Sequence, residues 1–148
     1  MRRKAPKKTK VLFVCIGNSC RSPMAEALAR HLAADVIEAS SAGTAALGMI
    51  AKLTAAALAE RGVRIDGQYS KQLQAQDCAA ADLIINMTGM PGKTLFDADQ
   101  MKVEDWDVED PYGSDLEVYQ RIRDDIEERV GKLAKRLRQN HPAPREAE

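Results

Sequence analysis

The chain has 148 residues, of which 45% are hydrophobic, 30% are charged and 4% are aromatic, and this length suits one globular domain. Its 22 Lys and Arg residues balance its 22 Asp and Glu residues, so no overall field attracts nucleic acid or anionic lipid. The longest strongly hydrophobic stretch, residues 11–16, is far shorter than the roughly 18 residues that span a bilayer. We therefore expect a cytoplasmic, monomeric protein with neither a membrane nor a nucleic-acid partner.

Charge is distributed unevenly along the chain. Six positive charges fall within the first ten residues, whereas Asp97 to Glu128 holds thirteen acidic residues against three basic ones. The apolar stretch that follows the basic start is too short for the core of a signal peptide. We expect a basic disordered arm over residues 1–9, a single domain over residues 10–139 and a frayed tail over residues 140–148.

A strand, a tight loop and a helix are predicted at the start of the domain. Residues 11–14 form a largely β-branched apolar run, which is typical of a strand buried on both faces of a parallel sheet. The loop from Ile16 to Ser22 comes next, and apolar side chains then recur at helical spacing as far as Leu32. Ser22 stands where an N-cap belongs, and Pro23 stands where a first helical turn tolerates proline.

The later elements alternate between strands and helices. We expect strands at residues 36–40, 82–87 and 102–108, a short extended piece at 63–65, and helices at about 50–61, 77–81 and 116–137. This alternation predicts an α/β fold of three layers, in which a four-stranded parallel sheet has helices on both faces. Binding sites in such folds form beyond the carboxyl ends of the strands, and Cys15 lies at such an end.

The loop after the first strand carries the pattern Cys-x5-Arg-Ser, from Cys15 to Ser22. Backbone N–H groups that wrap between a strand and a helix N-terminus form an anion-binding concavity, so the expected ligand is phosphate, sulfate or another oxyanion. Gly17 and Asn18 are residue types that tolerate left-handed backbone angles. Arg21 can hold a tetrahedral oxyanion with two parallel donors, and the same surroundings favour a nucleophilic thiolate at Cys15.

Other kinds of site fit these residues less well. A nucleotide-binding loop would end in Gly-Lys-Ser/Thr, and the glycine fingerprint of dinucleotide sites is absent. A zinc site would need four ligands, but Cys78 is distant in sequence, and His31 and His141 lie off any ligand spacing. An inert buried cysteine is the plainest alternative, but a strand, a glycine, a serine and a proline in register argue against it. We expect neither a metal nor a cofactor.

The stretch from Val14 to Ala27, VCIGNSCRSPMAEA, resembles the signature of low-molecular-weight protein tyrosine phosphatases, whose fold is shared by thioredoxin-coupled arsenate reductases. Ser-Ala-Gly-Thr at residues 41–44 and Asp-Pro-Tyr-Gly at residues 110–113 resemble two further landmarks of that family. The resemblance extends roughly from Lys10 to Leu137. It implies a phosphotyrosine protein phosphatase that hydrolyses aryl phosphate monoesters through a cysteinyl-phosphate intermediate.

The resemblance also assigns roles to individual residues. Cys15 would be the nucleophile, Arg21 the phosphate clamp and Asp110 the general acid. The backbone of four further residues would cradle the oxyanion: Ile16, Gly17, Ser19 and Cys20. Ser22 would hydrogen-bond the thiolate, and Asn18 would brace the loop. Tyr112 would form an aromatic wall beside the substrate. Taken alone, Asp110 is one of thirteen acidic residues between Asp97 and Glu128, and Asp-Pro is a common turn, so only its place in the pattern distinguishes it.

Two alternatives to a phosphatase stay open. Residues 18–22, 103–106 and 119–124 look as much like the arsenate reductase branch, but that chemistry needs two cysteines after the third strand, where residues 86–92 contain none. A reductase recharged by an external thiol is therefore the first alternative. A catalytically silent anion-binding module is the second.

Two details of the site also stay open. Cys20 either forms a protective disulfide with Cys15, as in related phosphatases, or packs beneath the loop. Many family members place a tryptophan soon after the Gly-Thr pair and a second aromatic residue after Tyr112. This chain has Ala-Ala-Leu at residues 45–47 and glycine at position 113 instead, which predicts a wider and less aromatic cleft.

Overall fold

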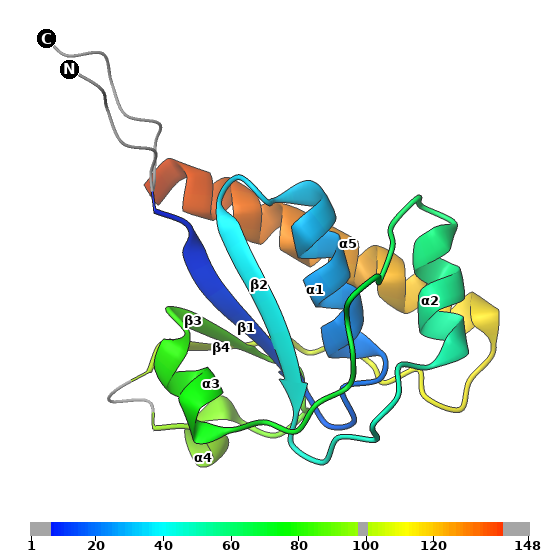
Figure 1. Cartoon of the computed structure of the whole chain (residues 1–148), viewed down its shortest axis with the longest axis horizontal. Helices are drawn as coiled ribbons and strands as arrows, with labels where there is room; N and C mark the ends of the chain where they lie inside the picture. Colours follow the sequence, from blue (N-terminus) through cyan, green and yellow to red (C-terminus); the bar gives the residue numbers. More distant parts are fainter. Residues whose placement is uncertain (1–6, 98–100, 141–148) are drawn as a thin grey trace, which may run out of the picture.

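The computed structural model describes residues 7–97 and 101–140 (Figure 1). Its sheet consists of four strands: β1 (Thr9–Cys15), β2 (Ile37–Gly43), β3 (Leu83–Asn86) and β4 (Val103–Asp105). Their order is β2-β1-β3-β4, and every neighbouring pair is parallel. The predicted α/β fold with a four-stranded parallel sheet is therefore confirmed.

Helices cover both faces of this sheet. They are α1 (Arg21–Leu32), α2 (Lys52–Ala59), α3 (Ala75–Ala80), α4 (Gly92–Leu95) and α5 (Leu116–Asn140). The first, second and fifth helices contact one another on one face, whereas α3 and α4 lie on the opposite side (Figure 1). The apolar stripe predicted for the last helix is buried against α1 and α2, from Tyr119 to Leu137.

The central strand β1 explains why its sequence is apolar throughout. Val11, Phe13 and Cys15 join the core on the α1 and α5 side, and Leu12 and Val14 join the core on the α3 side. Side chains alternate between the two faces of a strand, and here both faces are covered. All five residues are therefore 2% exposed or less.

The parallel register brings the carboxyl ends of three strands to one edge. Cys15 pairs with Gly43 at the end of β2, and Val14 pairs with Asn86 at the end of β3. The loop that follows Cys15 therefore lies beside the segments that leave the other two strands. This edge is where a parallel sheet forms its binding sites.

Several predicted boundaries differ from the structure. The second strand runs on through residues 41–43 instead of closing before them, the fourth strand is shorter than residues 102–108, and residues 63–65 form no strand. Helix α4 was not predicted, because four residues are too few to show a periodicity. Thr9 already belongs to β1 and Asn140 still belongs to α5. Most of the predicted arm and tail, residues 1–6 and 141–148, lies outside the described residues.

Ser22 is not the N-cap of α1. The helix begins at Arg21, and the cap position is held by Cys20, whose side chain makes no capping hydrogen bond. The Ser22 hydroxyl instead contacts Asn18 and Cys15. Pro23 does lie in the first helical turn, where no intrahelical partner is available for its missing N–H.

Candidate active site

The loop between β1 and α1 is held in shape by Asn18. Within the described residues, Asn18 is the non-glycine residue with a left-handed backbone, at φ +48°, and it is fully buried. Its Nδ2 donates to the hydroxyls of Ser22 (2.7 Å) and Ser41 (3.0 Å), and its Oδ1 accepts from the backbone N–H of Lys71 (2.8 Å). Three partners from three different segments therefore fix this turn.

Gly17 does not have the left-handed backbone that its residue type allows, because its φ is not positive. A Cβ there would lie 3.1 Å from the side chain of Leu47, so the position is sterically tight. The space at Gly43 is smaller still, because a Cβ there would collide with the carbonyl oxygen of Ile16. The close approach of β2 to the loop thus explains the glycine in the Ser-Ala-Gly-Thr stretch at residues 41–44.

The thiol of Cys15 lies at the base of the loop. Cys15 is a free cysteine and is 2% exposed. Its Sγ is 2.9 Å from the hydroxyl oxygen of Ser22, a spacing at which a hydroxyl can stabilise a thiolate. Cys15 itself faces the cavity described below.

Arg21 is held from behind by backbone carbonyls. Its side chain is 5% exposed, and its Nη1 donates to the carbonyls of Met87 (2.5 Å) and Val108 (3.2 Å). Its buried Nε has no partner among the described residues, and the same is true of the Ser19 hydroxyl. Buried donors of this kind are costly unless they are satisfied. An oxyanion in the loop is a ligand to which these donors are suited.

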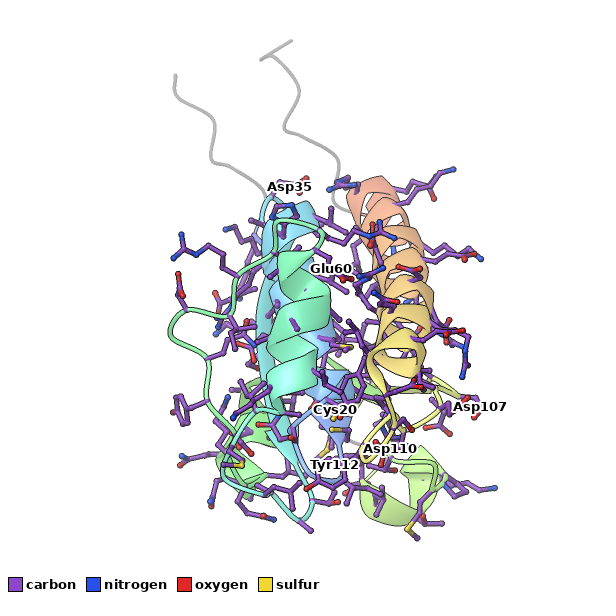
Figure 2. The ribbon with its side chains drawn as sticks, turned by 90° about the vertical axis from the view of Figure 1, so that its right-hand side faces the viewer. Cys20, Asp35, Glu60, Asp107, Asp110 and Tyr112 are labelled. Carbon is purple, nitrogen blue, oxygen red and sulfur yellow. The ribbon has the colours of Figure 1, made fainter. Side chains whose placement is uncertain are left out.

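Asp110 reaches the same place from a distant part of the sequence. Its Oδ2 lies 3.5 Å from Nη2 of Arg21, and its side chain is 48% exposed. Its Oδ1 accepts from the backbone N–H of Tyr112 (3.1 Å), a local turn that orients the carboxylate. Figure 2 shows Asp110, Tyr112 and Cys20 gathered at one end of the molecule.

These groups surround one cavity of about 280 Å³. Its lining consists of Cys15, Ile16, Gly17, Ser19, Cys20, Arg21, Ala45, Leu47, Asp110 and Tyr112. Eight of the ten site residues expected from the sequence are among them. Asn18 and Ser22 are not, because both are fully buried beneath the loop. The aromatic residue in the lining is Tyr112, and the wider and less aromatic cleft expected from the sequence stays a prediction.

Cys20 packs beneath the loop. Its Sγ lies 3.3 Å from the hydroxyl of Tyr119 on α5. Burial raises the pKa of the Cys20 thiol, and burial also raises the pKa of the Tyr119 hydroxyl, which hydrogen-bonds Cys20. Both groups therefore stay protonated near neutral pH. All three cysteines of the structure are free thiols, so the disulfide with Cys15 stays a prediction for the oxidised protein.

Cys78 lies apart from the site. It belongs to α3 and packs with Leu12 and Val14 in the core on the opposite face of the sheet from Cys15. Burial raises the pKa of its thiol. The structure therefore does not bring Cys78 to the cavity at the Cys15 loop.

Some supporting residues were missed at the level of sequence. Glu26 and Thr54 are buried and hydrogen-bond into the site, Glu26 through Ser41 and Thr54 through the carbonyl of Ser19. A signal for Glu26 was present, because it is the only acidic residue in an otherwise apolar stretch of α1. Nothing local distinguishes Thr54, whose role depends on the approach of α2 to the loop.

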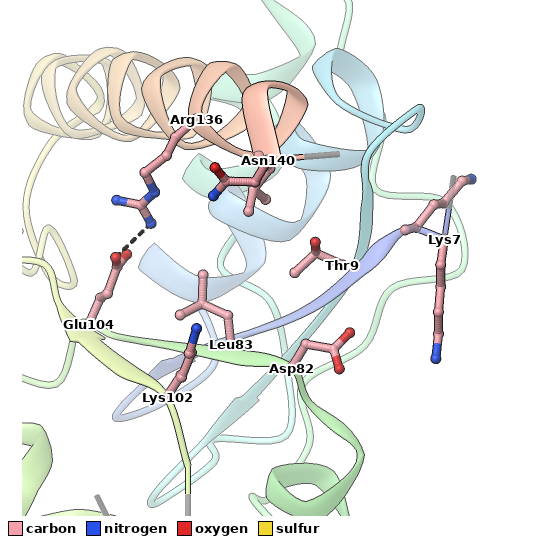
Figure 3. A pocket seen from close by; sticks show the side chains of 10 residues that line it. Lys7, Thr9, Asp82, Leu83, Lys102, Glu104, Arg136 and Asn140 are labelled. Atoms are coloured by element: carbon pink, nitrogen blue, oxygen red, sulfur yellow. Dashed lines mark hydrogen bonds and ion pairs between the residues drawn. The ribbon is translucent and has the colours of Figure 1, made fainter. Parts of the chain in front are cut away.

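A second cavity lies at the other edge of the sheet (Figure 3). It measures about 570 Å³, and its lining includes Lys7, Asp82, Lys102 and the ion pair between Arg136 and Glu104. None of the three cysteines lines it. Within residues 7–97 and 101–140, no group of His, Cys, Asp and Glu side chains is arranged to hold a metal ion, and no helix is long and apolar enough to span a membrane.

Comparison with known proteins places this geometry among related enzymes. Residues 10–143 match the family model described as low molecular weight phosphotyrosine protein phosphatase. A glutaredoxin arsenate reductase from Synechocystis sp. is 35% identical over 132 residues, which cover 86% of this chain and 98% of that protein. Among solved structures, the YwlE arginine phosphatase from Geobacillus stearothermophilus has a TM-score of 0.80 at 30% identity, with 89% of this chain and 94% of that chain covered. A low molecular weight protein tyrosine phosphatase from T. tengcongensis has a TM-score of 0.77 at 33% identity, with 88% and 100% covered.

Proposed function

Because the chain belongs to the low molecular weight phosphotyrosine protein phosphatase family, we propose that it is a phosphatase that cleaves phosphorylated protein side chains through a cysteinyl-phosphate on Cys15. One observation carries this proposal. The Cys15 thiol, the Arg21 guanidinium and the Asp110 carboxylate line the same cavity, although the acid is far from the other two in sequence. A nucleophile, an oxyanion clamp and a proton donor are the groups that hydrolysis of a phosphate monoester needs.

The reaction would proceed in two steps. In the first, Cys15 Sγ forms a bond to phosphorus as the bond to the leaving group breaks, and Asp110 donates its proton to that leaving group. In the second, Asp110 removes a proton from water, which displaces the sulfur and releases phosphate. Arg21 and the loop N–H groups hold the phosphoryl oxygens throughout, since phosphoryl transfer depends mainly on positioning and electrostatics.

The lining of the cavity favours phosphotyrosine as the side chain. Ile16, Ala45, Leu47 and Tyr112 offer apolar surface to a phenyl ring. Phosphoarginine is the second substrate to consider, because a relative of the same fold is an arginine phosphatase. Its guanidine leaving group is more basic than a phenolate, so it would depend even more on a proton from Asp110.

An arsenate reductase is the second candidate function, and the identity to a glutaredoxin arsenate reductase favours it. In that reaction an external thiol would attack the sulfur of a Cys15–arsenate adduct, giving a mixed disulfide and arsenite. A second thiol would then free Cys15. Cys78 could not take the place of the external thiol, because it lies on the other face of the sheet.

Two assays on the same protein preparation distinguish the phosphatase from the arsenate reductase. We expect phosphate release from p-nitrophenyl phosphate and from a phosphotyrosine peptide, slower release from a phosphoarginine peptide, and little arsenate-dependent oxidation of glutathione or glutaredoxin. Phosphate release and thiol oxidation are measured side by side, with Cys15→Ser as the control for contaminating activity. Arsenate-dependent thiol oxidation without phosphate release would favour the reductase, and neither activity would favour a silent anion-binding module.

The rim of the cavity supports a protein substrate. The described chain exposes seven large apolar side chains: Ile16, Leu32, Leu47, Met49, Tyr69, Met90 and Tyr112. All except Leu32 belong to segments around the loop. Leu47 N–H donates to the carbonyl of Gly17 (2.9 Å), and Gly48 N–H donates to the hydroxyl of Ser70 (3.1 Å), so the segments that carry Met49 and Tyr69 lie side by side. Exposed apolar side chains grouped beside a site are typical of a protein-binding surface.

The variant Met49→Ser tests this surface. Met49 is 69% exposed and does not line the cavity. We expect kcat/KM to fall about fivefold for a phosphorylated protein, because a partly buried apolar contact is lost, and to stay unchanged for p-nitrophenyl phosphate. Leu32→Ser is the matched control, since Leu32 is 40% exposed at the far end of α1. Equal losses for both substrates would argue against a docking role.

A further inference from the structure

A buried carboxylate that the mechanism does not use lies behind the site. Glu26 on α1 is 2% exposed. Its Oε1 accepts a hydrogen bond from the Ser41 hydroxyl (2.5 Å), and its Oε2 lies 2.6 Å from Nη2 of Arg30. A buried charge destabilises a fold unless it is paired and hydrogen-bonded, and Glu26 has both kinds of partner.

A continuous chain of hydrogen bonds joins Glu26 to Cys15. Ser41 accepts from Asn18 Nδ2 (3.0 Å), and the same Nδ2 donates to Ser22 Oγ (2.7 Å). That oxygen is 2.9 Å from Cys15 Sγ. The three connecting residues are each 1% exposed or less, so bulk water does not compete with these bonds.

The carboxylate sets the direction of this chain. A carboxylate only accepts, so the single proton of the Ser41 hydroxyl is directed to Glu26. Ser41 can then only accept from Asn18, whose amide is also kept from turning over by the Lys71 N–H on its Oδ1 (2.8 Å). Because Asn18 donates to Ser22, the proton of the Ser22 hydroxyl is left for the sulfur of Cys15.

We propose that Glu26 is a positioning residue for the reaction of Cys15: through Ser41 and Asn18 it orients the Ser22 hydroxyl so that it donates to the thiolate. The proposal deepens the phosphatase function and rests on it for its role in turnover. A hydrogen bond donated to the charged form of an acid favours that form. By this route Glu26 stabilises the charged sulfur as it attacks phosphorus.

The charged groups near Glu26 and near Cys15 are consistent with an effect of Glu26 on Cys15 through the hydrogen-bond chain. The titratable groups that line the cavity with Cys15 are Arg21, Asp110, Cys20 and Tyr112, and none of them has a hydrogen bond to Glu26. The charge of Glu26 is balanced locally by Arg30. Direct repulsion between this paired carboxylate and the thiolate is therefore small.

The variant Glu26→Gln tests the direction of the chain while keeping its volume. Arg30 donates only, so it will draw the single amide oxygen of glutamine to itself and leave the amide NH₂ facing Ser41. The Ser41 proton then turns towards the Asn18 NH₂, whose orientation the Lys71 N–H still holds, so two donors face each other and the link from Asn18 to Ser22 is disturbed. We expect alkylation of Cys15 by iodoacetamide to be about tenfold slower at roughly pH 6, as for the loss of one hydrogen bond to a charged group, and equal to wild type at about pH 10, which is above the range in which ordinary thiols ionise.

The same variant should lower kcat/KM for p-nitrophenyl phosphate at about pH 6 by a similar factor. The double variant Glu26→Gln with Arg30→Met should recover part of both losses, because its glutamine can turn the amide oxygen back to Ser41. Ser41→Ala breaks the same chain without touching the ion pair, and it serves if Glu26→Gln does not fold. A merely structural role would not show this recovery.

Asp35→Asn is the matched control. It removes an ion pair with Arg138 (2.8 Å) at the opposite end of the molecule from Asp110 and Cys20 (Figure 2). Its alkylation rates should equal those of wild type. Alkylation of Glu26→Gln and Ser41→Ala at the wild-type rate at both pH values, or an equal change in Asp35→Asn, overturns the proposal. If the alkylation difference is found but the wild-type chain releases no phosphate, the proposed function fails and the positioning role stands.

Discussion

Replacement of Cys15 by serine is expected to reduce phosphate release by on the order of 10⁴-fold or more, while phosphate still binds. The serine hydroxyl is a far weaker nucleophile near neutral pH, but the substitution leaves Arg21 and the loop N–H groups in place. These groups, rather than the sulfur, hold the oxyanion. Release from p-nitrophenyl phosphate measures the first effect, and titration calorimetry with inorganic phosphate measures the second.

The size of this loss reflects the whole arrangement rather than the ionisation of the thiol. An ordinary thiol with a pKa of about 8.5 is about 3% ionised at pH 7, so complete ionisation gains only ~30-fold, or ~2 kcal/mol. Most of the acceleration must therefore come from the oxyanion cradle and the proton donor.

Cys78→Ser is the control for Cys15→Ser. Cys78 is a buried thiol of the same chain, but it packs on the opposite face of the sheet. We expect this variant to keep wild-type turnover. A comparable loss in Cys78→Ser, or substantial turnover in Cys15→Ser, would contradict the assignment of the nucleophile.

Asp110→Asn is expected to slow hydrolysis of a phosphotyrosine peptide by ~10² to 10⁴-fold, the usual contribution of general acid catalysis. The effect on p-nitrophenyl phosphate should be much smaller. The phenolate of tyrosine has a conjugate acid with a pKa of about 10 and needs a proton as it leaves, whereas p-nitrophenolate is a good leaving group without one. Asparagine keeps the size of the side chain but has no carboxyl proton to donate.

Glu109→Gln is the matched control for the acid. Glu109 is the neighbouring residue, and its carboxylate lies 3.0 Å from Arg121 instead of facing the cavity. The hydrogen bond from Arg121 lowers the pKa of Glu109, so it holds no proton to donate near neutral pH. We expect its kinetics to match wild type for both substrates. An equal loss for good and poor leaving groups in Asp110→Asn would show that Asp110 acts as something other than the acid.

Local sequence was sufficient to predict the strand, the loop and the sheet edge that carry the candidate nucleophile. The apolar run of β1 predicts a strand that is buried on both faces, as it is in the structure. The alternation of strands and helices predicts the parallel sheet. Cys15 and Arg21 are close in sequence, so a single tight loop is enough to place both at the cavity. Each of these features depends on short-range periodicity or on backbone conformation, which a few neighbouring residues specify.

Contacts between distant segments were decided only by the tertiary structure. The Cys20 thiol meets Tyr119 across 99 positions. Local spacing assigned the Ser22 hydroxyl to a helix cap, whereas its contact with Cys15 was implied only by the family resemblance, and Asn18 donates to the same oxygen. Glu26 reaches the loop only through Ser41, which the register of β2 against β1 brings into place. Side-chain partners of this kind depend on how strands and helices pack, and residue spacing along the chain does not specify that packing.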